Sequence, residues 1–92
     1  MKQNVLKLYI TGRTSRSQEA VQNLRNIYKS INDPQFDIVV IDVLENPEQA
    51  EEDKILATPT LVYLTENSSN RIIGDISNSK DVLKLLNLAA EI

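Results

Sequence analysis

The chain contains no cysteine and no histidine, and only two of its 92 residues are glycine. Without thiols it can form neither a disulfide nor the mixed disulfide through which thiol–disulfide exchange proceeds. Without histidine it lacks the commonest metal ligand and the side chain that most often serves as a base near neutral pH. The two glycines leave no glycine-rich loop to cradle a phosphate. We therefore expect a binding protein with no catalytic residue, no cofactor and no metal.

Long apolar runs and aromatic side chains are also scarce. No apolar run approaches the roughly 20 residues that span a bilayer, and residues 1–7 lack the apolar core of a secretory signal, so we expect a cytoplasmic protein without a membrane partner. One Phe, three Tyr and no Trp give no basic–aromatic patch for nucleic acid. The 41% hydrophobic and 25% charged fractions are typical of a globular protein, and residues 1–92 make one domain.

The charges are unevenly distributed along the chain. Residues 1–35 carry six Lys or Arg against two Asp or Glu, whereas residues 36–92 carry four against eleven. Such asymmetry favours charge-complementary protein partners or self-association of unlike surfaces. Scattered solvating charge would give the same composition, so both interpretations stand.

The first half of the chain alternates between strand and helix patterns. Val5–Ile10 is a short apolar run rich in strand formers. Ser15 and Gln18 have the spacing of a capping box, and apolar residues recur at helical spacing from Ala20 to Ile31. The sequence therefore predicts a strand followed by one long helix.

A second strand and a second helix follow. Phe36–Leu44 predicts the strand, and its apolar centre, Ile38–Ile41, is typical of a parallel strand covered on both faces. Asn46 is a favourable N-cap, Pro47 suits the first helical position, and Gln49 has capping-box spacing. Strand, helix and strand at this spacing form a βαβ unit.

The last third predicts a hairpin and a terminal helix. Thr60–Leu64 is a third strand, a polar turn spans residues 65–70, and Arg71–Gly74 is a short fourth strand. An amphipathic helix begins after Ser77, with apolar positions Val82, Leu83, Leu85, Leu86, Leu88 and Ala89. The resulting order, βαβαββα, is that of a thioredoxin-like α/β fold.

Four segments of the chain resemble the KaiB family of cyanobacterial clock proteins and their bacterial relatives. They span residues 5–12, 40–47, 50–61 and 71–75. The stretch AEEDKILATPT at 50–60, together with RIIGD at 71–75, is highly specific for that family. The resemblance covers nearly the whole chain.

The resemblance implies a protein with two alternative folds. Members of this family adopt either the thioredoxin-like order, which binds the RecA-type clock ATPase KaiC, or a ground-state order, βαββααβ, that packs into tetramers. It also implies a homo-oligomer, either a dimer or a tetramer.

This chain departs from the family pattern in two places. Clock-active members commonly have a proline-rich turn at residues 66–70, and Gly and Asp where this chain has Leu85 and Asn87. Leu in place of Gly improves helix propensity by roughly 0.5–1 kcal/mol. We therefore expect the thioredoxin-like order, with a terminal helix in place of a strand.

The stretch that would hold a redox pair in thioredoxins is Gly12–Ser17, where serines stand in place of cysteines. We expect Ser15 or Ser17 to cap the first helix. The alternative is an anion held by Arg13, Arg16 and the free N–H groups of the helix.

Pro59 precedes the third strand, where thioredoxin-like folds place a cis-proline. Only about 5–6% of X–Pro bonds in folded proteins are cis. The position in the fold nevertheless leads us to expect a cis Thr58–Pro59 bond in the thioredoxin-like state.

By resemblance, the second helix and its exit carry the contact with KaiC, through Asn46, Pro47, Lys54, Ile55, Leu56 and Ala57. The alternative is that Ile55 and Leu56 are core residues and Lys54 is solvated, and we expect one of the two apolar residues to be core in either case. The neighbouring carboxylates have no histidine beside them, so we expect them to form a solvated helix face: Glu48, Glu51, Glu52 and Asp53.

Two functions are consistent with these residues. The first is a KaiB-like regulatory protein that binds a KaiC-type ATPase and modulates its cycle in a circadian, timing or stress-response system. The second is a KaiB-like protein that has lost ATPase binding and acts in stress adaptation through self-association or another partner.

Overall fold

The computed structural model describes residues 4–31, 36–66, 69–74, 76, 82 and 84. Its elements are β1 (Asn4–Ile10), α1 (Ser15–Ile31), β2 (Phe36–Asp42), α2 (Pro47–Glu52), β3 (Thr60–Leu64) and β4 (Ser69–Ile73). A helix separates β2 from β3, so the chain has the thioredoxin-like order and not the ground-state order.

The predicted terminal helix lies largely outside the described residues. Val82 and Lys84 are helical, and Val82 is buried among residues of β1, α1 and β3. The positions that lie outside the description are Leu83, Leu85, Leu86, Asn87, Leu88 and Ala89.

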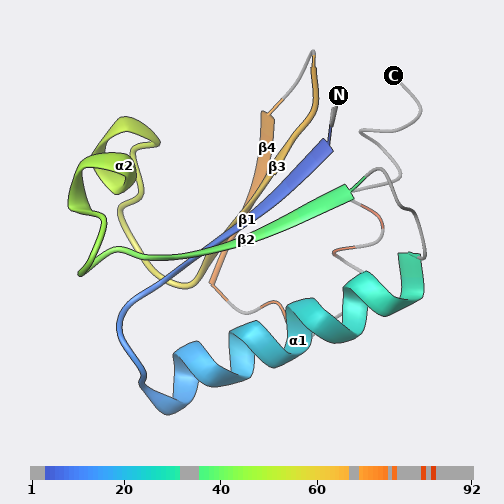
Figure 1. Cartoon of the computed structure of the whole chain (residues 1–92), viewed down its shortest axis with the longest axis horizontal. Helices are drawn as coiled ribbons and strands as arrows, with labels where there is room; N and C mark the ends of the chain where they lie inside the picture. Colours follow the sequence, from blue (N-terminus) through green and yellow to red (C-terminus); the bar gives the residue numbers. More distant parts are fainter. Residues whose placement is uncertain are drawn as a thin grey trace.

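The four strands form one mixed sheet with the order β2-β1-β3-β4 (Figure 1). β1 pairs in parallel with β2 and antiparallel with β3, so that Leu8 lies between Val40 and Leu61. β3 and β4 pair antiparallel from Thr60 opposite Ile73 to Leu64 opposite Ser69, which confirms the predicted hairpin. Its fourth strand begins two residues earlier than predicted.

The sheet separates two hydrophobic cores. The larger core lies between the sheet and α1, and its buried residues are Leu6, Leu8, Ala20, Leu24, Ile27, Leu61, Tyr63, Ile76 and Val82. The smaller core lies on the other face beneath α2 and contains Tyr9, Ile41, Ala50 and Val62. In Figure 1, α1 runs along the bottom of the view and α2 lies at the upper left. α1 and α2 therefore lie on opposite faces of the sheet.

The prediction that β2 is covered on both faces is wrong. β2 is an edge strand of the sheet, and Val39 and Val40 remain 40% and 44% exposed. An apolar run indicates a strand, but it does not tell a central strand from an edge strand. The strand also ends at Asp42, two residues earlier than predicted, because the Asp42 carboxylate accepts the Leu44 N–H at 2.9 Å and turns the chain.

The same Asp42 oxygen joins the two turns that follow β1 and β2. It accepts a second hydrogen bond, at 3.0 Å, from the N–H of Gly12. Gly12 has a φ of +63°, a conformation that glycine adopts without steric cost. The turn that begins α1 is thereby fixed to the turn that begins α2.

Thr14, and not Ser15 or Ser17, caps α1. The Thr14 hydroxyl accepts the Ser17 N–H at 3.1 Å, and Ser15 is already the first helical residue. The buried Ser17 hydroxyl donates to the Thr11 carbonyl oxygen. The capping pattern was predicted one residue too late because Thr14 and Ser15 are both suitable capping residues.

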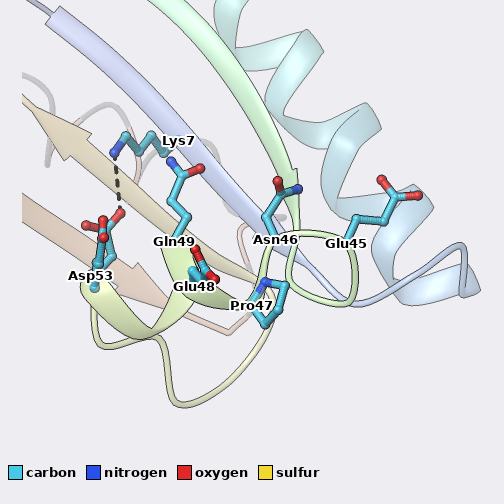
Figure 2. A pocket seen from close by; sticks show the side chains of 8 residues that line it. Lys7, Glu45, Asn46, Pro47, Glu48, Gln49 and Asp53 are labelled. Carbon is cyan, nitrogen blue, oxygen red and sulfur yellow. Dashed lines mark hydrogen bonds and ion pairs between the residues drawn. The ribbon is translucent and has the colours of Figure 1, made fainter.

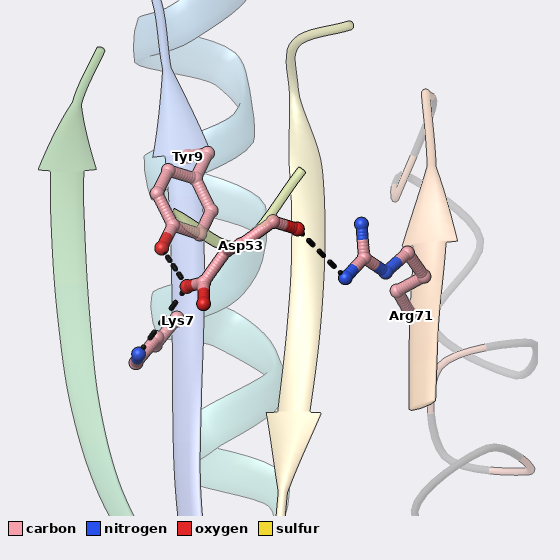
Figure 3. Close-up of polar contacts among 4 residues, drawn as sticks. All are labelled: Lys7, Tyr9, Asp53 and Arg71. Atoms are coloured by element: carbon pink, nitrogen blue, oxygen red, sulfur yellow. Dashed lines mark hydrogen bonds and ion pairs between the residues drawn. The ribbon is translucent and has the colours of Figure 1, made fainter. Parts of the chain in front are cut away.

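A polar cluster on β1 fixes α2 to the sheet (Figure 3). The buried Tyr9 hydroxyl donates to the Asp53 carboxylate. The Lys7 ammonium lies 3.3 Å from the same oxygen. The hydrogen bond from Tyr9 holds the pKa of the Asp53 carboxyl below its usual value, and Lys7 acts in the same direction against the effect of burial. Burial and the Asp53 carboxylate together raise the pKa of the Tyr9 hydroxyl above its ordinary value.

The end of α2 is a Schellman motif with lysine in the left-handed position. The Lys54 N–H donates to the Glu51 carbonyl at 3.0 Å, and the Ile55 N–H donates to the Ala50 carbonyl at 2.9 Å. Lys54 has a φ of +55°, a conformation that glycine adopts far more often than residues with a β-carbon. The Arg71 guanidinium donates to the carbonyl oxygens of Asp53 and Lys54, at 3.0 and 3.4 Å, and so holds this turn against β4.

Acid should weaken the attachment of α2. The pKa of the Asp53 carboxyl is lower in the folded chain than in the unfolded chain, where it is about 3.9. The bonds of Asp53 therefore stabilise the fold fully above the unfolded pKa, and this stabilisation is lost as the pH falls through the folded pKa. At about pH 7, Asp53→Asn should lower the free energy of unfolding by about 1.5 kcal/mol, the low end for a hydrogen bond to a charged group, because the side chain is partly exposed. Urea unfolding at about pH 7 and about pH 3 tests this.

Glu52→Gln is the matched control, since it removes an exposed neighbouring carboxylate. It should change the stability little at either pH. The role of Asp53 would be contradicted if the free energy of unfolding fell as much between about pH 7 and about pH 3 in Asp53→Asn as in the native chain.

Glycine at position 54 should stabilise the fold. A left-handed conformation costs a residue with a β-carbon about 1–2 kcal/mol, and glycine avoids this cost. Glycine also loses more backbone entropy on folding, which offsets part of the stabilisation. Lys54→Gly should raise the free energy of unfolding by about 0.5–1 kcal/mol. Glu52→Gly, within the right-handed part of α2, should lower it by about as much. Urea denaturation of both variants makes the comparison, and a loss of stability in both would exclude strain at Lys54.

Candidate docking surface

Two hollows flank α2, and each contains part of the predicted docking surface. The acidic hollow has a volume of about 480 Å³ and is lined by Lys7, Glu45, Asn46, Pro47, Glu48, Gln49, Glu52 and Asp53. The apolar hollow has a volume of about 520 Å³ and is lined by Val43, Pro47, Ala50, Glu51, Lys54, Ile55 and Leu56. Pro47 borders both, so α2 forms the ridge between them.

The apolar hollow brings together four of the six predicted docking residues: Pro47, Lys54, Ile55 and Leu56. Asn46 lines the acidic hollow instead, and Ala57 is exposed but lines neither. The cis Thr58–Pro59 bond lies directly before β3, where a cis-proline was expected. Pro59 itself is buried.

Ile55 and Leu56 take different roles. Ile55 packs against the smaller core, whereas Leu56 is 96% exposed. Because the turn after α2 is closed by two backbone hydrogen bonds and by Arg71, this leucine projects from an ordered part of the chain. Leu56 thereby adds an exposed apolar group to the lining of the apolar hollow.

The acidic hollow is open to solvent, and Figure 2 shows the ion pair of Lys7 and Asp53 among its lining side chains. Asn46 occupies the N-cap position of α2, but its side chain makes no capping bond. Its amide instead donates to the Asp42 carbonyl oxygen at 3.3 Å. Glu48 and Glu52 are exposed, as expected for a solvated helix face.

The expectation that Asp53 belongs to that solvated face is wrong. Its side chain is 30% exposed and is bound by Tyr9 and Lys7. The alternation of β1 carries the signal that was overlooked, because Lys7 and Tyr9 share the face opposite Leu6 and Leu8. A tyrosine and a lysine on an inner face require a polar partner, and the end of α2 supplies one. Arg71 was also missed, since nothing in the sequence relates it to the turn after α2.

Neither a membrane-spanning helix nor a metal site is found in the described part of the chain. No helix there is long and apolar enough to cross a bilayer. No three carboxylates there are placed so that they could hold a metal ion.

Comparison with known proteins identifies the family. The family model described as the KaiB domain matches residues 7–88. The circadian clock protein KaiB3 of Synechocystis sp. is 45% identical over 91 residues, which cover 99% of this chain and 89% of that protein. The circadian clock oscillator protein KaiB of Thermostichus vulcanus is 49% identical over 87 residues, covering 95% of this chain and 81% of that protein.

A solved structure supports the fold. The N-terminal domain of SasA from Synechococcus elongatus superposes with a TM-score of 0.74 at 23% identity, covering 94% of this chain and 81% of that one. At this identity the likeness concerns the thioredoxin-like fold alone. From the family model and the two KaiB relatives, we conclude that the chain belongs to the KaiB family.

Proposed function

We propose that this protein is a non-enzymatic regulator that docks on a KaiC-type, RecA-like ATPase and modulates its cycle in a circadian or other timing system. The observation that carries the proposal is the apolar hollow, with Leu56 fully exposed beside it on a turn that four hydrogen bonds hold in place. The relatives named as clock proteins support the choice of partner.

In this proposal, the charged residues that line the apolar hollow affect how tightly the ATPase binds. Lys54 is the only basic residue between Glu45 and Leu64, and it lies beside Glu51 at the edge of the hollow. Lys54 therefore offers the partner a positive contact at the apolar hollow, whose other charged lining residue is Glu51. The backbone at Lys54 is fixed by the Schellman motif, so the direction in which the side chain leaves the turn is restricted.

No exchange of thiols enters this function, because the chain has no cysteine. In the stretch that would hold a thioredoxin redox pair, the Thr14 hydroxyl caps α1 and the Ser17 hydroxyl donates to the Thr11 carbonyl oxygen. The thioredoxin-like fold serves here as a rigid support for α2 and its exit turn.

Reversing the charge of Lys54 should weaken binding to the ATPase. We expect Lys54→Glu to raise the dissociation constant by at least about tenfold at low salt, because an unfavourable charge at an interface costs affinity. Lys29→Glu makes the same charge change at an exposed position of α1, on the opposite face, and should leave the affinity nearly unchanged. Isothermal titration calorimetry of both variants against a KaiC-type ATPase measures this.

Thermal melts provide the folding control, since both side chains are exposed and neither forms a salt bridge within the described part of the chain. Equal affinities for the two variants, with native binding intact, would remove Lys54 from the docking surface.

A further inference from the structure

A third hollow lies along α1, on the face of the sheet opposite α2. Its volume is about 320 Å³, which is at the lower end for small-molecule sites, about 300–1,000 Å³. Its floor is formed by two half-buried residues that pack against the larger core, Ile10 at the end of β1 and Val21 on α1. We call this hollow the α1 groove. Its size and its apolar floor suit a small ligand with an apolar part.

The α1 groove is elongated and has an arginine at each end. Four of its lining residues come from α1: Gln18, Val21, Gln22 and Arg25. Their spacing places them on one face of the helix, and from Gln18 to Arg25 this face is about 10 Å long, at about 1.5 Å per residue. The turn before α1 borders the Gln18 end, because the Gln18 side-chain amide donates to the Arg13 carbonyl oxygen at 3.2 Å. Arg13 and Arg25 therefore lie at opposite ends of the groove.

The uncharged polar side chains of the groove already have partners within the chain. The buried Ser17 hydroxyl and the Gln18 amide donate to backbone carbonyl oxygens. The Gln22 amide donates to the Asn26 side chain at 3.2 Å. Within the described part of the chain, neither guanidinium of the groove forms a hydrogen bond or a salt bridge, and the described lining residues include no carboxylate. The polar side chains without a partner there are therefore both cationic.

The structure gives Arg13 a different neighbour from the one that the sequence suggested. The sequence offered Arg13 and Arg16 as partners of an anion, but Arg13 shares the groove with Arg25, and Arg16 does not line it. A guanidinium binds a carboxylate through two parallel hydrogen bonds. The apolar floor between the arginines adds a contact that an inorganic anion does not use. The complementary ligand is therefore an anion with an apolar chain.

We propose that the α1 groove binds a free medium-chain fatty acid in its carboxylate form. One guanidinium holds the carboxylate, and the alkyl chain lies over Ile10 and Val21, where it is removed from water. A protein that lies on a bilayer projects apolar side chains into it, whereas Ile10 and Val21 are half-buried at the floor of a hollow. The groove therefore takes up a single free chain and does not insert into a membrane.

Titration of the isotope-labelled chain with decanoate, followed by nuclear magnetic resonance, tests this site. We expect saturating shifts at the amides of Ile10, Gly12 and Val21, and none at residues 46–57. Acetate has the same head group without the chain, and decyltrimethylammonium has the chain with the opposite charge. Each should bind at least about tenfold more weakly than decanoate, because each lacks one of the two contacts.

Two double variants test the arginines. Arg13→Gln with Arg25→Gln should raise the dissociation constant for decanoate at least about tenfold, because it removes both charged donors. Arg16→Gln with Lys29→Gln makes the same change in charge at two residues of α1 that do not line the groove, and it should bind decanoate like the native chain. All four side chains are exposed, so thermal melts should show both variants folded.

Several results would overturn the proposal. Shifts that do not saturate, or an equal affinity for decanoate in the native chain and the groove variant, would exclude the site. Equal binding of acetate would indicate an adventitious ion only, and equal binding of decyltrimethylammonium would indicate apolar contact alone. Vesicles of phosphatidylglycerol provide the membrane arm and should not sediment with the chain. Sedimentation that requires both arginines, without binding of decanoate, would assign the groove to a membrane surface instead.

The fatty-acid site does not depend on the proposed function, since α2 and its exit turn lie on the other face of the sheet. The groove variant should therefore bind the KaiC-type ATPase with the affinity of the native chain. If decanoate binds and the ATPase does not, only the proposed function fails. If the ATPase binds and decanoate does not, only the fatty-acid site fails.

Discussion

The bonds that Asp53 makes to β1 determine where α2 lies on the sheet. α2 is only six residues long, and a helix of that length depends on tertiary contacts for its stability. Its buried apolar contribution is the single residue Ala50, so the polar contacts of Asp53 with Tyr9 and Lys7 supply much of its attachment. Arg71 completes the attachment through the last carbonyl groups of the helix. The position of the proposed docking surface therefore depends on the bonds that Asp53 and Arg71 make.

The local patterns of the chain predict its elements well. The apolar spacing of residues 20–31 predicts α1, Asn46 and Pro47 predict the start of α2, and the polar turn predicts the hairpin. These signals depend only on neighbours in sequence. The exposure of Val39 and Val40 was not predictable in this way, because it depends on which strand lies at the edge of the sheet.

The candidate surface could be predicted only in outline. Four of the six predicted residues meet at the apolar hollow. The different roles of Ile55 and Leu56, however, follow from the turn before them, where Lys54 adopts a left-handed conformation that the sequence does not predict. Tyr9 and Arg71 act on that turn from positions 44 and 18 residues distant from Asp53. Contacts across such separations arise from the register of the sheet, which a single sequence does not specify.

Hydrogen–deuterium exchange of the chain, alone and with a KaiC-type ATPase, tests the proposed docking surface most directly. We expect the ATPase to slow exchange at the amides of residues 46–57, while α1 exchanges as it does in the free chain. Protection that is confined to α1 or to the β2 edge, with residues 46–57 unchanged, would contradict docking through α2 and its exit turn.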